Sequence, residues 1–233
     1  MPDISLYYVK KGSGPPLVLL HGNGEDSGYF SRQIDFFAHT HTVYALDTRG
    51  HGWSPRGTAP FTLYQFARDL LDFLDQQNIS QTDILGFSDG GNIALLFALS
   101  HPERVWRLVL NGANLDPTGV KPAVQLPIIL SYQIASLFAA KNLKAQHNAE
   151  LLGLMVREPH IAPASLKRLA VPALVIAGNR DMIKESHTRL IAESLPGGTL
   201  RVIPGSHFIA AENPDAFNAA VQDFFAAHPI QGR

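Results

Sequence analysis

Short apolar runs bounded by turn residues recur along the chain and predict buried β-strands. These runs are Leu17–Leu20, Val43–Leu46, Ile84–Leu85, Leu108–Leu110 and Ala173–Ala177. Segments with apolar residues at helical spacing predict helices at Leu63–Gln77, Gly91–Ser100, Ile183–Ser194 and Pro214–Ala227. Because doubly buried strands alternate with helices, the predicted fold class is α/β, with a mostly parallel central sheet and helices on both faces.

The alternation breaks once, between Asp116 and Ala170, where the pattern indicates two or three helices and no convincing strand. We therefore predict an α/β core made of residues 1–115 and 171–233, and a short helical lid insertion at 116–170, before the acid-bearing strand. Helices inserted between two strands fold back over the edge of the sheet. If that edge holds the ligand site, they form a lid.

Within this insertion, residues 122–140 carry no charge and are flanked by Lys121 and Lys141. The stretch approaches the length of a membrane-spanning helix. Pro127, Gln125 and Tyr132 interrupt it, and polar side chains are costly in hydrocarbon. We therefore predict no membrane span, but a helix with one apolar face turned to a pocket or to the core.

Composition narrows the possible partners of the chain. Its 233 residues include 19 Lys and Arg against 20 Asp and Glu, so no strong net field favours nucleic acid. The absence of cysteine excludes disulfides, thiol nucleophiles and cysteine-based zinc sites. The N-terminus alternates like a strand and lacks an apolar signal core, which predicts a cytoplasmic protein. Composition does not define an oligomeric state.

Polar residues follow the predicted strands, and one of them is a serine between glycines. The stretch Gly86-Phe87-Ser88-Asp89-Gly90 joins a predicted strand to a predicted helix. A strand that runs directly into a helix needs a sharp turn, and glycines two before and two after the serine remove the Cβ atoms that would collide there. A serine hydroxyl is too weakly acidic to attack unaided, so the motif predicts a base, an orienting acid and oxyanion donors.

Four motifs in order give the chain a resemblance to α/β-hydrolase-fold serine hydrolases over most of its length, from Leu6 to Ala227. They are His21-Gly22, the Asp-x-Arg-Gly-x-Gly-x-Ser stretch at 47–54, the elbow around Ser88, and a late Asp followed by His. The order Ser, Asp, His is that of this fold. The Ser-Asp-Gly-Gly elbow is similar to that of the valacyclovir hydrolase group, whose members cleave amino acid esters.

The resemblance implies a role for three catalytic residues. Ser88 resembles the nucleophile, His207 the general base, and Asp181 the acid that orients His207. Asp116, which follows the preceding strand, is a rival for the acid, but the Ala-Gly-Asn-Arg-Asp setting of Asp181 matches the family pattern. By the same resemblance the oxyanion hole uses the backbone N–H groups of Asn23 and Asp89.

Other polar and apolar residues receive less specific interpretations. The Asp89 carboxylate either pairs with a substrate ammonium or is favoured by the dipole at the start of the next helix, and we favour the dipole. Asp47, Arg49, His51 and Ser54 are expected to shape their loop. For the substrate pocket we expect apolar residues of the lid together with one residue beside His207: Leu126, Leu130, Ile134, Phe138 and Phe208.

These residues predict a cofactor-free and metal-free serine hydrolase, a carboxylesterase that cleaves small to medium esters through an acyl-enzyme. The alternatives are a low-turnover ligand receptor or signalling module on the same fold, or, within enzymes, an aminoacyl-ester or C–C bond hydrolase. A nucleotide-binding interpretation of Gly22-x-Gly24 is weaker. Ser27 stands where this motif needs its third glycine, and the nucleotide-binding interpretation leaves Ser88, Asp181 and His207 without a role.

Overall fold

The computed structural model describes residues 2–230; Met1 and residues 231–233, which end the predicted core, lie outside the described residues. The strands are β1 Tyr8–Lys11, β2 Pro16–Leu20, β3 Thr42–Leu46, β4 Thr82–Phe87, β5 Val105–Asn111, β6 Ala173–Gly178 and β7 Gly198–Ile203. The α-helices are α1 Ser31–Phe37, α2 Leu63–Gln76, α3 Asp89–Ser100, α4 Pro122–Phe138, α5 Leu143–Arg157, α6 Pro163–Leu166, α7 Glu185–Ser194, α8 Ile209–Glu212 and α9 Pro214–Ala227. Every predicted strand and helix corresponds to one of these elements.

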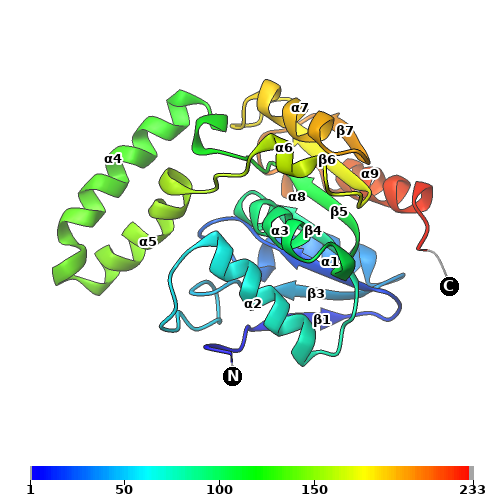
Figure 1. Cartoon of the computed structure of the whole chain (residues 1–233), viewed down its shortest axis with the longest axis horizontal. Helices are drawn as coiled ribbons and strands as arrows, with labels where there is room; N and C mark the ends of the chain where they lie inside the picture. Colours follow the sequence, from blue (N-terminus) through cyan, green and yellow to red (C-terminus); the bar gives the residue numbers. More distant parts are fainter. Residues whose placement is uncertain (1, 231–233) are drawn as a thin grey trace.

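The strands form one seven-stranded sheet in the order β1-β3-β2-β4-β5-β6-β7 (Figure 1). Only β1 is antiparallel to its neighbour β3, and the other neighbouring pairs are parallel. The predicted α/β fold class is therefore confirmed. Because β2 to β7 run in one direction, the loops after them gather at one edge of the sheet, which is where ligands bind in such folds.

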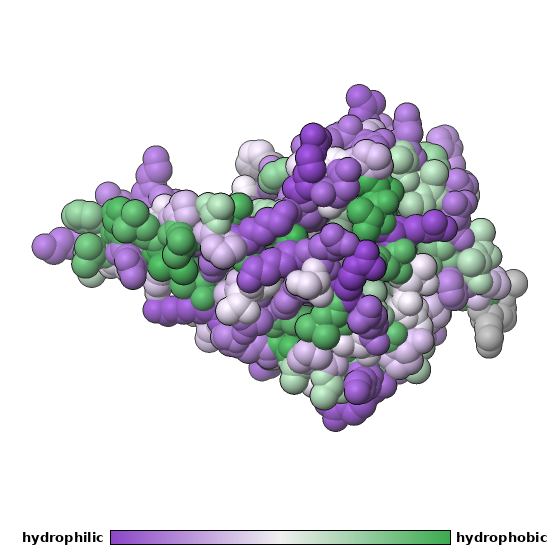
Figure 2. All heavy atoms as spheres, turned by 90° about the horizontal axis from the view of Figure 1, so that it is seen from above, coloured by the Kyte–Doolittle hydropathy of each residue, from purple (hydrophilic) through white to green (hydrophobic). Residues whose placement is uncertain are grey.

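The insertion forms a helical hairpin of α4 and α5, followed by the short helix α6. In Figure 1 the hairpin projects from the body of the molecule, and Figure 2 shows apolar residues gathered on the projecting part. The prediction that the apolar face of this uncharged segment turns to a pocket or the core is wrong, because only 6% of the apolar window in Pro122–Lys141 is buried. One side of α4 packs on α5, and the rest faces solvent.

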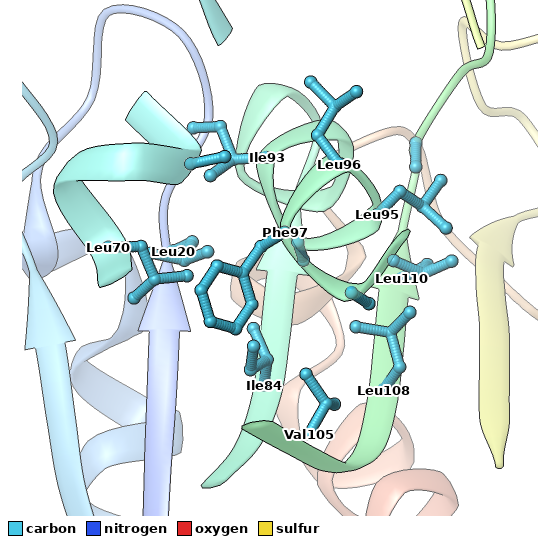
Figure 3. Packing of buried hydrophobic residues seen from close by; sticks show 14 of the residues in the cluster. Leu20, Leu70, Ile84, Ile93, Leu95, Leu96, Phe97, Val105, Leu108 and Leu110 are labelled. Atoms are coloured by element: carbon cyan, nitrogen blue, oxygen red, sulfur yellow. The ribbon is translucent and has the colours of Figure 1, made fainter. Parts of the chain in front are cut away.

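The hydrophobic core lies in two layers, one on each face of the sheet. Alternate residues along the strands enter opposite layers, as in Leu19 and Leu20 of β2. One layer is covered by α2 and α3, and Figure 3 shows Phe97 of α3 with Leu70 of α2 and Ile84 of β4. The other layer is covered by α1, α8 and α9. Strands β2 to β6 are thus buried on both faces, which explains their continuous apolar runs, whereas the edge strands β1 and β7 are partly exposed.

An ion pair is buried at the opposite edge of the sheet, where the parallel strands begin. Asp83 of β4 accepts hydrogen bonds from the guanidinium of Arg107 in β5, and both side chains are buried. Arg107 Nη1 also donates to the carbonyl oxygens of Phe225 and His228, at the end of α9. Burial raises the pKa of Asp83. This pair therefore joins two central strands to the last helix.

We predict that Arg107→Met destabilises the protein by about 3–5 kcal/mol, because it leaves the buried Asp83 carboxylate without its guanidinium partner. The free energy of unfolding is measured by urea denaturation. Asp83→Asn/Arg107→Met should recover part of the loss. Lys11→Met removes the exposed pair with Asp35 and is the control, which should change the free energy of unfolding much less. Equal losses for Arg107→Met and Lys11→Met would contradict the prediction.

Candidate active site

Ser88 occupies a strained turn between β4 and α3. Its φ is 53° and its ψ is −119°, a combination that L-residues rarely adopt. A Cβ on Gly86 would collide with the carbonyl of Gly90, and a Cβ on Gly90 would collide with the carbonyl of Leu20. The two glycines therefore let helix α3 start directly against the end of β2. Ser88 is left half-buried at the carboxyl edge of the sheet.

The structure brings Ser88, His207 and Asp181 together in one hydrogen-bonded series. His207, in the loop between β7 and α8, lies with Nε2 3.0 Å from Ser88 Oγ. Its Nδ1 lies 2.7 Å from Oδ1 of Asp181, in the loop after β6. Asp181 Oδ1 also accepts the backbone N–H of Ile183 at 2.9 Å. In such a series the imidazole can accept the serine proton through Nε2 while the carboxylate holds Nδ1–H.

Asp116, the rival acid, is paired with a different histidine. Its carboxylate Oδ2 is 2.9 Å from Nδ1 of His160, an exposed histidine after α5. Its other oxygen accepts the backbone N–H of Thr118 at 2.9 Å. The structure thus pairs Asp181, and not Asp116, with His207.

The two predicted oxyanion donors lie on loops at the same edge of the sheet. Asn23 follows β2, and Asp89 is the first residue of α3. Among the described residues, neither backbone N–H donates a hydrogen bond in a turn or loop, and the first residue of a helix has no partner inside it. Both backbone N–H groups are therefore without a hydrogen-bond partner among the described residues.

The Asp89 carboxylate is engaged by two amide side chains. It accepts hydrogen bonds from Nδ2 of Asn23 at 2.9 Å and from Nδ2 of Asn92 at 3.3 Å. It is also buried, and this burial raises its pKa. The Asn23 amide donates a second hydrogen bond to the carbonyl of Leu151 in α5, at 2.9 Å. Sequence reasoning identified only the backbone of Asn23; its side-chain contacts span 66 and 128 positions, and no local pattern encodes them.

The stretch from Asp47 to Ser54 builds the neighbouring loop. Asp47 accepts the backbone N–H groups of Ser27 and Trp53, each at 2.8 Å, and Ser54 Oγ donates to the carbonyl of Asp47 at 2.6 Å. Arg49 is fully buried and binds both carboxylate oxygens of Asp69 at 2.7 Å. These contacts agree with a loop-shaping role. No group of three or more His, Cys, Asp or Glu side chains that could hold a metal ion occurs in residues 2–230.

Four of the five predicted pocket residues are not placed at Ser88. Leu126, Leu130, Ile134 and Phe138 are each between 51% and 64% exposed on α4. The physical reason is the position of α4, which packs on α5 and projects from the body (Figure 1). The prediction that they line the pocket is therefore corrected. Phe208 does lie at the site, with its ring centroid 5.6 Å from that of His207.

Sequence reasoning missed two polar side chains beside the candidate site. One is Tyr29, which stacks on Phe87 with a distance of 4.4 Å between the ring centroids. The Phe87 ring centroid in turn lies 4.8 Å from that of His207. The Tyr29 hydroxyl is buried and has no hydrogen-bond partner among the described residues. Glu25 accepts the N–H of Gly22 at 3.2 Å, and partial burial raises its pKa to about 7. Nothing in the Gly-Asn-Gly-Glu sequence distinguishes this carboxylate from a solvated one.

Comparison with known proteins places the chain in a wide group of hydrolases. A family model described as alpha/beta hydrolase fold matches residues 15–155. The putative carbamate hydrolase RutD of Azorhizobium caulinodans is 30% identical, with 95% of each chain covered. The 3-oxoadipate enol-lactonase 2 of Acinetobacter baylyi is 27% identical, over 94% of this chain and 92% of that protein. A hydrolase structure from Pseudomonas aeruginosa has a TM-score of 0.79 at 27% identity, covering 95% of this chain and 94% of that one.

The raised pKa of Glu25 predicts a pH dependence of stability. The unfolded chain ionises this carboxyl near its ordinary value of 4.5, whereas the folded chain holds the proton until about pH 7. Ionisation between these values therefore favours unfolding. As the pH rises from 5 to 7.5, wild type should lose stability relative to Glu25→Gln, measured by urea denaturation at each pH. Glu193→Gln on α7 makes the same chemical change and is the matched control. The prediction is refuted if the difference in the free energy of unfolding between wild type and Glu25→Gln stays constant over this pH range.

Proposed function

The chain belongs to the α/β-hydrolase fold family, and on that premise we propose that it is a serine hydrolase that cleaves small to medium carboxylic esters. The observation that carries the proposal is the pair of hydrogen bonds of His207, to Ser88 Oγ at 3.0 Å and to Asp181 Oδ1 at 2.7 Å. In this proposal Ser88 is the nucleophile, His207 the general base and Asp181 the orienting acid.

The proposed reaction has two halves with one acyl-enzyme between them. His207 Nε2 takes the proton of Ser88 Oγ while Oγ bonds to the ester carbonyl carbon, and the carbonyl oxygen becomes an oxyanion. The N–H groups of Asn23 and Asp89 bind that oxyanion. The C–O bond to the alcohol then breaks, and His207 returns its proton to the leaving oxygen. Water, deprotonated by His207, next attacks the acyl-enzyme, and the acid leaves as Ser88 regains its proton.

Several observations favour an ester as the substrate. The names of two relatives, a carbamate hydrolase and an enol-lactonase, both describe the cleavage of a bond between an acyl carbon and a heteroatom. Beside His207, the exposed ring of Phe208 offers an apolar surface for an acyl or alcohol group. This surface comes from the loop that carries His207, which suits a small to medium group. The Asp89 carboxylate is already engaged by Asn23 and Asn92, which favours a plain ester over an aminoacyl ester.

We predict that Ser88→Ala lowers kcat by at least about a thousandfold, as in other triads. The measurement is steady-state turnover across p-nitrophenyl esters of increasing chain length, a lactone, a carbamate and an aminoacyl ester. A fluorophosphonate should label wild type, and not Ser88→Ala. Negligible turnover of every substrate by wild type, together with ligand-induced thermal stabilisation, would instead support a receptor on this fold.

Two acid-to-amide variants distinguish the proposed orienting acid from its rival. Asp181→Asn should lower kcat by about ten-thousandfold, because the amide cannot hold His207 in the required tautomer. Asp116→Asn is the matched control and should keep kcat within a fewfold of wild type, since Asp116 contacts His160. Both are measured on the best ester of the series. An equal loss in the two variants would contradict the assignment.

A further inference from the structure

The outer face of the α4/α5 hairpin carries a stripe of large apolar side chains that residues 2–230 leave exposed. Its members are between 51% and 84% exposed: Leu126, Leu130, Ile134, Leu137, Phe138 and Leu143. Figure 2 shows apolar residues on this projecting part of the molecule. Single exposed apolar residues are ordinary, but a contiguous patch of this kind marks an interaction surface.

The helix that bears most of this stripe has the composition of a membrane helix, but its packing prevents it from spanning one. Pro122–Lys141 has a mean hydropathy of 1.5 over its most apolar window and is long enough to cross a bilayer. Its inner side is fixed to α5: Gln125 Nε2 donates to the carbonyl of Met155 at 3.1 Å, and Arg157 lies over the Tyr132 ring. A helix packed on one side and apolar on the other suits the plane of a membrane interface.

The hairpin is attached to the body by polar contacts on the opposite side from the stripe. Glu150 of α5 pairs with Arg56 at 2.7 Å, and Glu158 accepts the backbone N–H of Leu63 at 2.7 Å. Asn23 donates to the carbonyl of Leu151. Because these contacts fix α5 to the core, the stripe on α4 stays directed outward.

The segment that carries most of the stripe differs in charge from the rest of the chain. Residues 117–149 contain none of the 20 acidic residues and three of the 19 basic ones, Lys121, Lys141 and Lys144. Lys141 and Lys144 form no ion pair within residues 2–230. They flank the turn between α4 and α5, beside Leu137 and Leu143, the two most exposed members of the stripe. A second copy would bring equal positive charge against this surface, whereas an anionic surface complements it.

We propose that the outer face of the α4/α5 hairpin docks this protein on a lipid bilayer that contains anionic headgroups. The apolar stripe enters the boundary between headgroups and acyl chains, and Lys141 and Lys144 contact the anionic headgroups. This surface is independent of the proposed hydrolase chemistry. It holds the protein at a membrane with the whole α/β core outside the hydrocarbon.

The test is co-sedimentation of the full chain with vesicles of phosphatidylcholine alone or mixed with phosphatidylglycerol. Wild type should bind the mixed vesicles more tightly, and added salt should weaken that binding. Lys141→Gln/Lys144→Gln should lose about 30-fold in affinity for the mixed vesicles and little for pure phosphatidylcholine. Leu137→Gln/Leu143→Gln should lose binding to both.

Leu190→Gln, at an exposed leucine of α7 on the body, is the matched control and should bind like wild type. Turnover of a soluble ester and the far-UV circular dichroism spectrum should be unchanged in all these variants, which separates docking from folding. The proposal is overturned if wild type binds neither vesicle, or if Leu137→Gln/Leu143→Gln binds like wild type. The proposal would also be overturned if wild type formed a dimer in solution and bound no vesicles, and if Leu137→Gln/Leu143→Gln were a monomer. That result would identify a second copy as the partner.

Discussion

The candidate site depends on one close approach, that of the start of α3 to the end of β2. Only a glycine at position 90 lets the helix begin beside the carbonyl of Leu20, and only a glycine at 86 lets the strand turn so sharply before it. Ser88 is thereby held at a φ of 53°, which the surrounding close packing must maintain. This turn sets the place of Ser88 Oγ relative to His207, and of the Asp89 N–H relative to the loop of Asn23.

The polar groups around that turn are fixed mainly by hydrogen bonds to backbone and amide groups. His21 illustrates this, because its Nε2 accepts the N–H of Thr48 at 3.0 Å, Nδ1 lies 2.7 Å from the carbonyl of Gly22, and burial lowers its pKa. Asp89 and Glu25 are also buried enough that their pKa values are raised. The buried ion pair of Asp83 and Arg107 lies at the other edge of the sheet. Burial therefore makes the ionised forms of Asp89 and Glu25 costly at the edge that holds Ser88.

The hairpin of α4 and α5 connects this site to the outer surface of the molecule. Its inner helix contacts the loop of Asn23 and the loop of Arg56, while its outer helix presents the apolar stripe. A surface that binds lipid would therefore lie one helix away from the proposed oxyanion loop. The same α5 backbone that carries Leu151 separates the stripe from Ser88.

The sequence by itself determined the α/β class, most strands and most helices, because strands buried on both faces give continuous apolar runs that local patterns reveal. It also placed Ser88 and Asp181 after predicted strands, and the resemblance to α/β-hydrolase-fold serine hydrolases identified His207 as the residue that would act with them. The contact of Asn23 with the Asp89 carboxylate and the raised pKa of Glu25 were decided only by tertiary structure, because each depends on groups far apart in the chain. The structure pairs Asp181 with His207, as the family pattern had favoured. The direction of the α4 stripe was decided in the same way: helical spacing shows that a helix has an apolar face, but only the packing of α5 against the core determines whether that face meets a pocket or the solvent.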